Sequence, residues 1–132
     1  MSGETDLRTL IRAMRPELNQ EEYIFCIFES MNSALVYNPI FIFQEKEGVT
    51  AILKRETADA ANIPYKSTFA WITITIHSSL EAVGLTAAFS QALTQANISC
   101  NVVAAYHHDH IFVPVKDAGR AMEALEQLAE SK

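Results

Sequence analysis

The stretch Trp71-Ile72-Thr73-Ile74-Thr75-Ile76-His77 decides the fold class. Isoleucine stands at every second position, and the side chains between are threonine, tryptophan or histidine. Because successive side chains of a strand point to opposite faces, this alternation predicts a β-strand with one buried face. The other face then carries Thr73, Thr75 and His77. The strand begins the second half of the chain, where the sequence pattern predicts the remaining elements as clearly.

A helix and two further strands follow that first strand. From Leu85 the apolar residues recur at helical spacing, which predicts a helix with one buried face. They are Leu85, Ala88, Phe89, Ala92, Leu93 and Ala96. We expect strands over 98–106 and 111–115, with a polar turn at 107–110 between them. Pro114 avoids central strand positions, so it suggests a bulge or an unpaired strand end.

A final helix, capped by Asp117, completes the second half. The order strand, helix, strand, strand, helix is the α+β ferredoxin-like plan without its fourth strand. Such a sheet needs that strand to shield the edge of the first. The missing strand has to come from the first half or from another chain.

The first half contains apolar runs that could form that fourth strand. Asp6–Met14 has helical spacing, and Pro16 ends the helix. Tyr23–Phe28 and Ile40–Phe43 are apolar on both faces, so we expect central strands that are covered on two sides.

A hairpin turn at 45–48 and a short helix at 56–61 complete the first half. We therefore predict two degenerate ferredoxin-like halves of βαββα type, residues 1–66 and 67–132, the first with a shortened first helix. The two halves share or pack their sheets.

The composition excludes several classes of function. The chain has 132 residues, is 49% hydrophobic and carries a net charge of −6, which argues against nucleic-acid binding because that requires clustered Lys and Arg. No apolar run has the length of a membrane span. The first residues carry neither the basic nor the apolar region of a secretory signal, and Cys26 and Cys100 fit buried free thiols. We expect a cytoplasmic protein.

The polar residues of the second half converge at one end of the predicted sheet. In this fold the end of the first strand, the start of the first helix and the turn before the third strand lie together. The loop 78–84 then lies beside 107–110, which makes a polar cluster of His77, Ser78, His108, Asp109 and His110. The helix start offers backbone N–H groups to a carboxylate or phosphate, and Gly84 allows close approach.

A metal site is an alternative at the same place. His108 and His110 share one strand face, with His77 as a possible third ligand, and three imidazoles with an open position would suit zinc. No motif with defined metal-ligand spacing is present, so we predict no metal and no cofactor. A Gly-x-Ser-x-Gly elbow and a Gly-rich phosphate loop are also missing, so we predict no catalytic residues.

Three longer runs in the second half resemble a family of small bacterial proteins made of tandem, degenerate ACT domains with no attached enzyme. They are His-Ser-Ser-Leu-Glu-Ala-Val-Gly-Leu-Thr-Ala at 77–87, Asn-Ile-Ser-Cys-Asn-Val-Val-Ala-Ala-Tyr at 97–106 and His-Asp-His-Ile-Phe-Val at 108–113. The first half is similar to the same family at 14–18, 23–26 and 45–50.

The resemblance implies a non-enzymatic module that binds an amino acid or another small effector and regulates a partner. ACT ligands commonly lie between two ACT units, against the loop after the first strand and the start of the first helix. That implies contacts from Ser79, Glu81, Ala82, Val83, Gly84 and Leu85, facing Asn101 and Val102 of the next strand or of a partner. The loop departs from the common ACT pattern, because Glu81-Ala82-Val83 precede the glycine where an acidic residue and a proline are usual.

The leading hypothesis is therefore a module for a carboxylate-bearing small molecule. The second is a metal-binding protein or metal-dependent enzyme using the three histidines, and the third is an interaction module without a ligand. A homo-oligomer is expected, because the sheet face with Thr73, Thr75, Val103, Ala105 and Phe112 needs a cover.

Overall fold

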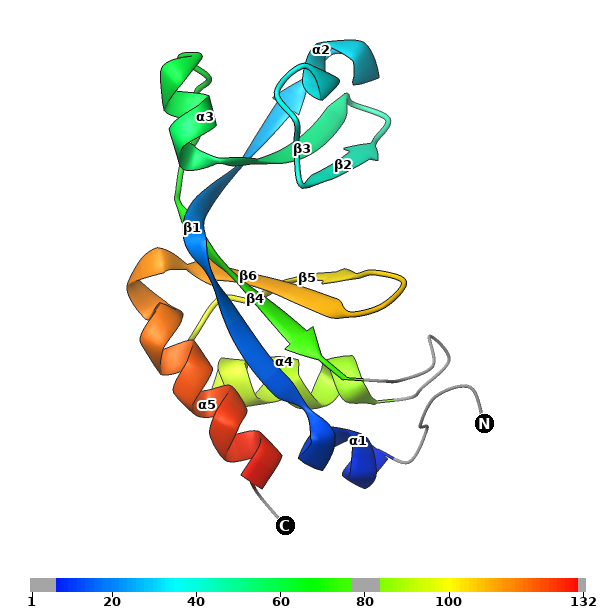
Figure 1. Cartoon of the computed structure of the whole chain (residues 1–132), viewed down its shortest axis with the longest axis vertical. Helices are drawn as coiled ribbons and strands as arrows, with labels where there is room; N and C mark the ends of the chain where they lie inside the picture. The colour runs from blue at the N-terminus through cyan, green and yellow to red at the C-terminus, as the bar shows by residue number, and fades with distance from the viewer. Residues whose placement is uncertain (1–6, 77–83, 131–132) are drawn as a thin grey trace. The chain divides into compact units, whose positions relative to one another are not determined.

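The computed structural model describes residues 7–76 and 84–130 (Figure 1). The chain forms two compact units. Unit 1 joins residues 1–19 to 70–132, and unit 2 is residues 20–69. The 14-residue strand β1 (Arg15–Phe28) contributes to both, since it passes from unit 1 to unit 2 after Asn19.

Unit 1 has a four-stranded sheet in the order β1-β4-β6-β5. Its strands beside the start of β1 are β4 (Phe69–Thr75), β5 (Asn101–Ala104) and β6 (Asp109–Pro114). Its helices are α1 (Leu7–Ala13), α4 (Leu85–Gln95) and α5 (Ala118–Glu130), with a 3-10 turn η1 (Val115–Asp117) before α5. This confirms the α+β, ferredoxin-like fold.

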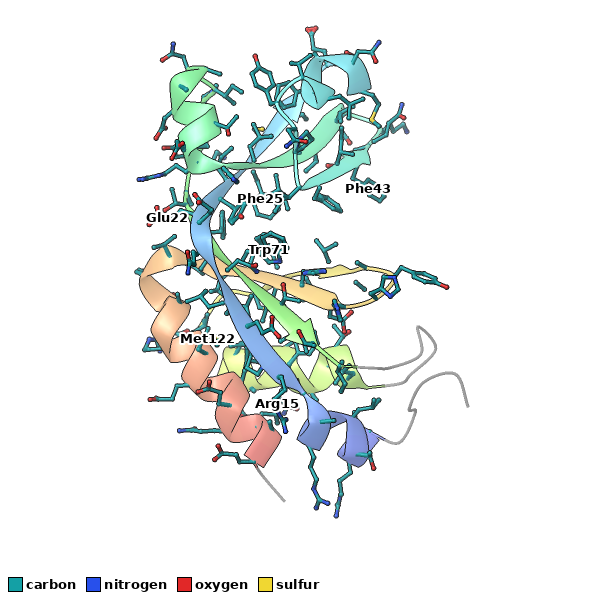
Figure 2. All side chains as sticks on the ribbon, viewed as in Figure 1. Arg15, Glu22, Phe25, Phe43, Trp71 and Met122 are labelled. Atoms are coloured by element: carbon teal, nitrogen blue, oxygen red, sulfur yellow. The ribbon has the colours of Figure 1, made fainter. Side chains whose placement is uncertain are left out.

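The core of unit 1 lies between one face of this sheet and the helices. Ile72, Ile74 and Ile76 are buried in it, as the alternation predicts. The buried face of α4 supplies Leu85, Phe89 and Leu93. Trp71 projects from the opposite face, away from the helices (Figure 2). The sheet therefore has a helix-covered face and an opposite face, the Trp71 face, on which Phe112 is 2% exposed.

The first half supplies the missing fourth strand. The start of β1 lies beside β4 in the sheet. Asn19 Nδ2 donates to the carbonyl oxygen of Trp71 over 3.0 Å, and Thr75 Oγ1 donates to Glu17 Oε2 over 3.1 Å. Leu10 and Met14, just before this strand, are fully buried in the unit 1 core. The edge that the second half leaves open is closed from within the same chain.

Two boundaries in unit 1 differ from the prediction. The strand expected over 98–106 is the shorter β5, because Ile98 packs into the core as α4 ends. The turn occupies Ala105–His108, where Ala105 N–H donates to the His108 carbonyl over 3.0 Å. The β5–β6 pairing runs from Ala104↔Asp109 to Asn101↔Phe112, so Pro114 ends β6 beyond the last β5 partner.

Unit 2 has a three-stranded sheet in the order β2-β3-β1. It comprises the rest of β1, α2 (Met31–Leu35), β2 (Phe41–Gln44), β3 (Val49–Lys54) and α3 (Arg55–Ala60). Strand β3 pairs antiparallel with β1, from Tyr23↔Lys54 to Phe28↔Val49, and with β2, from Phe41↔Ile52 to Gln44↔Val49. A capping box between Ser30 and Ser33 starts the short α2.

Tyr23–Phe28 lies in β1, a central strand as predicted, but the prediction that Ile40–Phe43 is a central strand is wrong. β2 is an edge strand, and Phe43 is 58% exposed. Ile27, on the same sheet face in β1, is 62% exposed. An apolar run indicates strand propensity, but it does not show that a second layer covers each face. The face with Ile24, Ala51 and Leu53 forms the unit 2 core cluster, whereas the opposite face carries buried Tyr23 and Ile52 as well as the exposed residues.

Candidate functional site

The candidate site lies at one end of the unit 1 sheet. Strand β4 ends at Thr75, α4 begins at Leu85, and the turn Ala105–His108 leads into β6. The start of α4 and this turn lie at the same end of the sheet (Figure 1). His77, Ser78, Ser79, Glu81, Ala82 and Val83 lie outside the described residues, so their part in the site remains a prediction.

Gly84 has the backbone conformation that makes it necessary at this end. It is the N-cap residue of α4 with φ +94°, a left-handed conformation that L side chains rarely adopt. Its carbonyl accepts the Ala88 N–H over 2.9 Å. A Cβ at Gly84 would lie 3.1 Å from Leu7 Cδ2. Gly84 offers no side-chain oxygen to the first-turn amides of α4, which carry the positive end of the helix dipole.

Leu85 and Val102 offer a ligand mainly their backbones. Leu85 is 4% exposed within the unit 1 core, and half-buried Val102 packs against the same core. Their side chains are part of the fold.

Asn101 lies at the opposite end of unit 1 from Gly84. The eleven residues of α4 separate the two ends, a rise of about 16 Å at 1.5 Å per residue. Asn101 pairs with Phe112 near the end of β6, and its Nδ2 donates to the Phe112 carbonyl over 3.3 Å. The structure therefore does not bring Asn101 and Gly84 together within one unit 1.

Asp109 lies at the site end of β6. It has the strand parity of Ile111 and Val113, which are buried under the helices, so its position is on the helix-covered face. Burial raises the pKa of its carboxyl, and the nearby His108 lowers it by a smaller amount. A partly desolvated carboxylate at this place favours a cationic partner.

His110 belongs to a hydrogen-bonded cluster on the Trp71 face. Its Nδ1 accepts the indole N–H of Trp71 over 2.9 Å and lies 3.2 Å from Thr73 Oγ1. Since an indole nitrogen only donates, Nδ1 carries no proton, and the neutral ring has its proton on Nε2. Burial lowers the pKa of His110, and His108 lowers it further.

This cluster argues against the alternative of a metal site. A neutral imidazole has one free lone pair, and Trp71 occupies that of His110. Among residues 7–76 and 84–130, no group of three or more His, Cys, Asp or Glu is arranged to hold a metal ion. His108 Nδ1 is buried without a hydrogen-bond partner in the described part of the chain. Its ring meets that of His110 edge to face, with centroids 6.3 Å apart.

The comparison with protein families settles the family. Residues 2–70 match a model described as an ACT domain, and residues 66–127 match a second model with the same description. The chain belongs to the ACT domain family. It is a tandem ACT protein, in which the two matches overlap at residues 66–70 and unit 1 combines residues from both.

Solved structures agree with this ACT fold. The chain is 44% identical to a Vibrio cholerae protein of unknown function, described as a possible transport protein, over 93% of this chain and 95% of that one, with a TM-score of 0.86. It is 14% identical to the ligand-free regulatory subunit of aspartate kinase from Thermus thermophilus, over 86% and 95% of the two chains, with a TM-score of 0.65. A protein from Agrobacterium tumefaciens is 13% identical over 88% and 89%, with a TM-score of 0.64. No curated protein sequence matches the chain.

The helices of the described residues include none that is both long enough and apolar enough for a membrane crossing.

Proposed function

We propose that this tandem ACT protein is a non-enzymatic regulatory module that binds a small carboxylate-bearing molecule, and that this molecule is an amino acid. The main observation is the backbone of Gly84, which opens α4 with φ +94° and no side chain over the first-turn amides. Such amides bind carboxylates well. ACT domain membership supports the same class of ligand, and the fold is shared with a regulatory subunit of aspartate kinase.

In this proposal the two charged ends of the amino acid have different partners. The backbone N–H groups of Gly84 and Leu85 hold the carboxylate. Asp109, at the same end of the sheet, takes the ammonium group, because a cation relieves the unfavourable burial of its charge. The loop residues Ser79, Glu81, Ala82 and Val83 complete the site.

Asn101 and Val102 contribute from a second copy. Within one chain Asn101 is at the far end of α4, so only another molecule can place it against Gly84. β5 is the last strand in the unit 1 sheet order, which leaves its outer edge for such a partner. The proposal therefore includes a homo-oligomer with two-fold symmetry.

We also propose a cytoplasmic location, which fits Cys26 and Cys100 as free thiols. The regulated partner would be a metabolic enzyme or a transporter. A transporter is named because the Vibrio cholerae relative is described as a possible transport protein.

A thermal-shift screen tests the proposal. The purified protein is heated with each of the twenty common amino acids, with nucleotides and with divalent metals. A ligand at 100 times its dissociation constant adds about 2.7 kcal/mol to the free energy of unfolding, which raises the midpoint by several degrees. A shift with one amino acid or a few supports the proposal, whereas shifts with metals alone or with nothing contradict it.

A further inference from the structure

The polar cluster on the Trp71 face of unit 1 comprises Asn19, Trp71, Thr73 and His110. Asn19 is the last residue of β1 in unit 1, and Ala70, just before Trp71, is where the chain returns to it. The side chain of Asn19 donates to the Trp71 carbonyl over 3.0 Å and to Thr73 Oγ1 over 3.2 Å. The start of β1 and the strand β4 thus share one set of side-chain hydrogen bonds.

The directions of these hydrogen bonds follow from the donors. The indole of Trp71 can only donate, so His110 Nδ1 is the acceptor. Thr73 Oγ1 accepts from Asn19 and lies 3.2 Å from the same Nδ1, where its hydroxyl shares the single lone pair with the Trp71 N–H. All three partners are satisfied only while His110 is neutral with its proton on Nε2.

Protonation of His110 breaks this arrangement. The imidazolium carries a proton on each ring nitrogen, so turning the ring restores no acceptor. The new Nδ1 proton meets the Trp71 N–H, and Thr73 Oγ1 is the nearest atom of the cluster that can accept it. The Trp71 N–H then loses the hydrogen bond to His110, while its half-buried ring still stacks on Phe112 at a centroid distance of 6.1 Å.

We propose that His110 is a pH-sensitive switch: its neutral ring accepts the Trp71 indole N–H, and its protonation breaks that hydrogen bond. Because Thr73 Oγ1 accepts from Asn19 and lies beside the same ring nitrogen, the rearrangement also reaches the start of β1 within unit 1. Mild acid thereby loosens the side-chain hydrogen bonds between β1, β4 and β6. The inference does not depend on the proposed ligand.

The charged and titratable groups around His110 in unit 1 support a single titration. On β4 its neighbours are Trp71 and Thr73, and β5 places Val103 opposite it. β1 brings Asn19 and, two residues away, Glu17, which accepts a hydrogen bond from Thr75. The turn brings His108 in ring contact with His110, followed by His107, which contacts His108; adjacent Asp109 lies on the opposite face. His108 disfavours the charged form, as burial does.

The experiment follows the indole N–H of Trp71 by NMR between about pH 8 and about pH 5, where a histidine charges. Trp71 is the only tryptophan of the chain, so its signal needs no assignment. The expected result is a protected, downfield-shifted indole N–H at the higher pH that loses protection with the charging of His110. Nitrogen shifts of the His110 ring must report the Nε2–H form above that transition.

The variant His110→Asn is the critical control. Asparagine Oδ1 bonds to Cγ as histidine Nδ1 does, so it keeps the acceptor but does not titrate. Relative to this variant, the folding equilibrium constant of the wild type should fall by up to about tenfold per pH unit below pH ~6.5, until His110 is charged in the folded state. His107→Asn, in the same turn but exposed, must leave the transition unchanged.

Three outcomes would overturn the switch. One is a proton on Nδ1 of neutral His110, and another is loss of indole protection in His110→Asn at the same pH as in the wild type. The third is an indole N–H that stays protected after His110 has been charged. If His110→Asn does not fold, Trp71→Phe replaces it, because removing the donor must raise the pKa of His110 in the ring nitrogen titration.

Discussion

The side-chain amide of Asn19 donates a hydrogen bond to the carbonyl oxygen of Trp71, 3.0 Å away, although 52 positions separate the two residues. This bond fastens the start of β1 beside β4, the strand that opens the second half. Residues 7–19 therefore belong to the same compact unit as the second half of the chain, although they lie in the first half of the sequence. The fourth strand of the unit 1 sheet is thus the start of β1.

The core contacts of α1 lead to the first prediction. Leu10 is 1% exposed in the unit 1 core. Leu10→Ala should therefore lower the free energy of unfolding by about 2–5 kcal/mol. Arg8→Ala, an exposed change in the same helix, should stay within about 0.5 kcal/mol. Urea unfolding compares them, and equal stability of the two variants would show that α1 does not belong to this core.

The second prediction concerns the backbone of Gly84. Gly84→Ala should cost about 1–2 kcal/mol, because alanine is strained at φ +94°. Its Cβ also meets Leu7 Cδ2 at 3.1 Å. Gly84 is therefore also needed for stability. If it served only as a ligand contact, a side chain here would leave the fold unaffected.

Gly119→Ala is the matched control for this change. No heavy atom lies within 4 Å of a Cβ at Gly119, and the residue is in α5. Alanine should stabilise the helix there by up to about 1 kcal/mol. If both substitutions shift the unfolding midpoint in the same direction, the left-handed conformation of Gly84 is wrong.

The third prediction concerns Arg120 of α5, which pairs with Asp117 of η1 and donates a hydrogen bond to the C-cap of α4. Arg120 Nη2 lies 2.8 Å from Asp117 Oδ1, and Arg120 Nη1 donates to the Ala96 carbonyl over 2.8 Å. Arg120→Ala leaves Asp117, 8% exposed, without this partner. Because the guanidinium is half exposed, we expect a loss of only about 1–2 kcal/mol.

Arg55→Ala provides the comparison for Arg120→Ala. Arg55 makes looser surface pairs with Glu22 and Asp59, at 3.5 and 4.0 Å. The loss there should be below about 1 kcal/mol. Chemical denaturation of both variants measures the difference, and a larger loss for Arg55→Ala would reverse this ranking.

The fourth prediction is a pH dependence caused by Asp109. Burial raises the pKa of its carboxyl in the folded state, so the folded protein binds this proton more tightly than the unfolded chain does. The stability that it contributes is complete below pH ~3.8 and is lost as the pH rises through the raised pKa. Asp109→Asn should therefore be more stable than the wild type at neutral pH, with the difference shrinking in acid. A variant that is less stable at neutral pH would show that the carboxylate has a stabilising partner.

Local patterns predicted most of the fold because they fix which face of an element is buried. The alternation at Trp71–His77 and the helical spacing from Leu85 both correspond to the elements of unit 1. Coverage was harder to predict: Phe43 is apolar yet exposed in an edge strand, since covering a strand depends on distant segments. The compact units were not predictable either, because they depend on Asn19 meeting Trp71.

The candidate site divides in the same way. Topology alone places the turn before β6 at the same end as Gly84, because it follows from the order of strands. Which ring nitrogen of His110 carries the proton could not be predicted from the sequence. It depends on a tryptophan 39 positions away that donates to one of the two ring nitrogens. The burial that marks Asp109 likewise comes from helices remote in the chain.

Calorimetric titration of the full chain with the amino acid selected by the thermal screen tests the central claim most directly. Asp109→Asn is titrated beside the wild type, with Asp59→Asn as the control, because Asp59 is an exposed aspartate in unit 2. The account predicts saturable binding that is at least about tenfold weaker in Asp109→Asn, as expected for the loss of a charge-assisted hydrogen bond, and unchanged in Asp59→Asn. Binding of equal strength in all three proteins would contradict the placement of the ligand, and no binding to the wild type would contradict the proposed function itself.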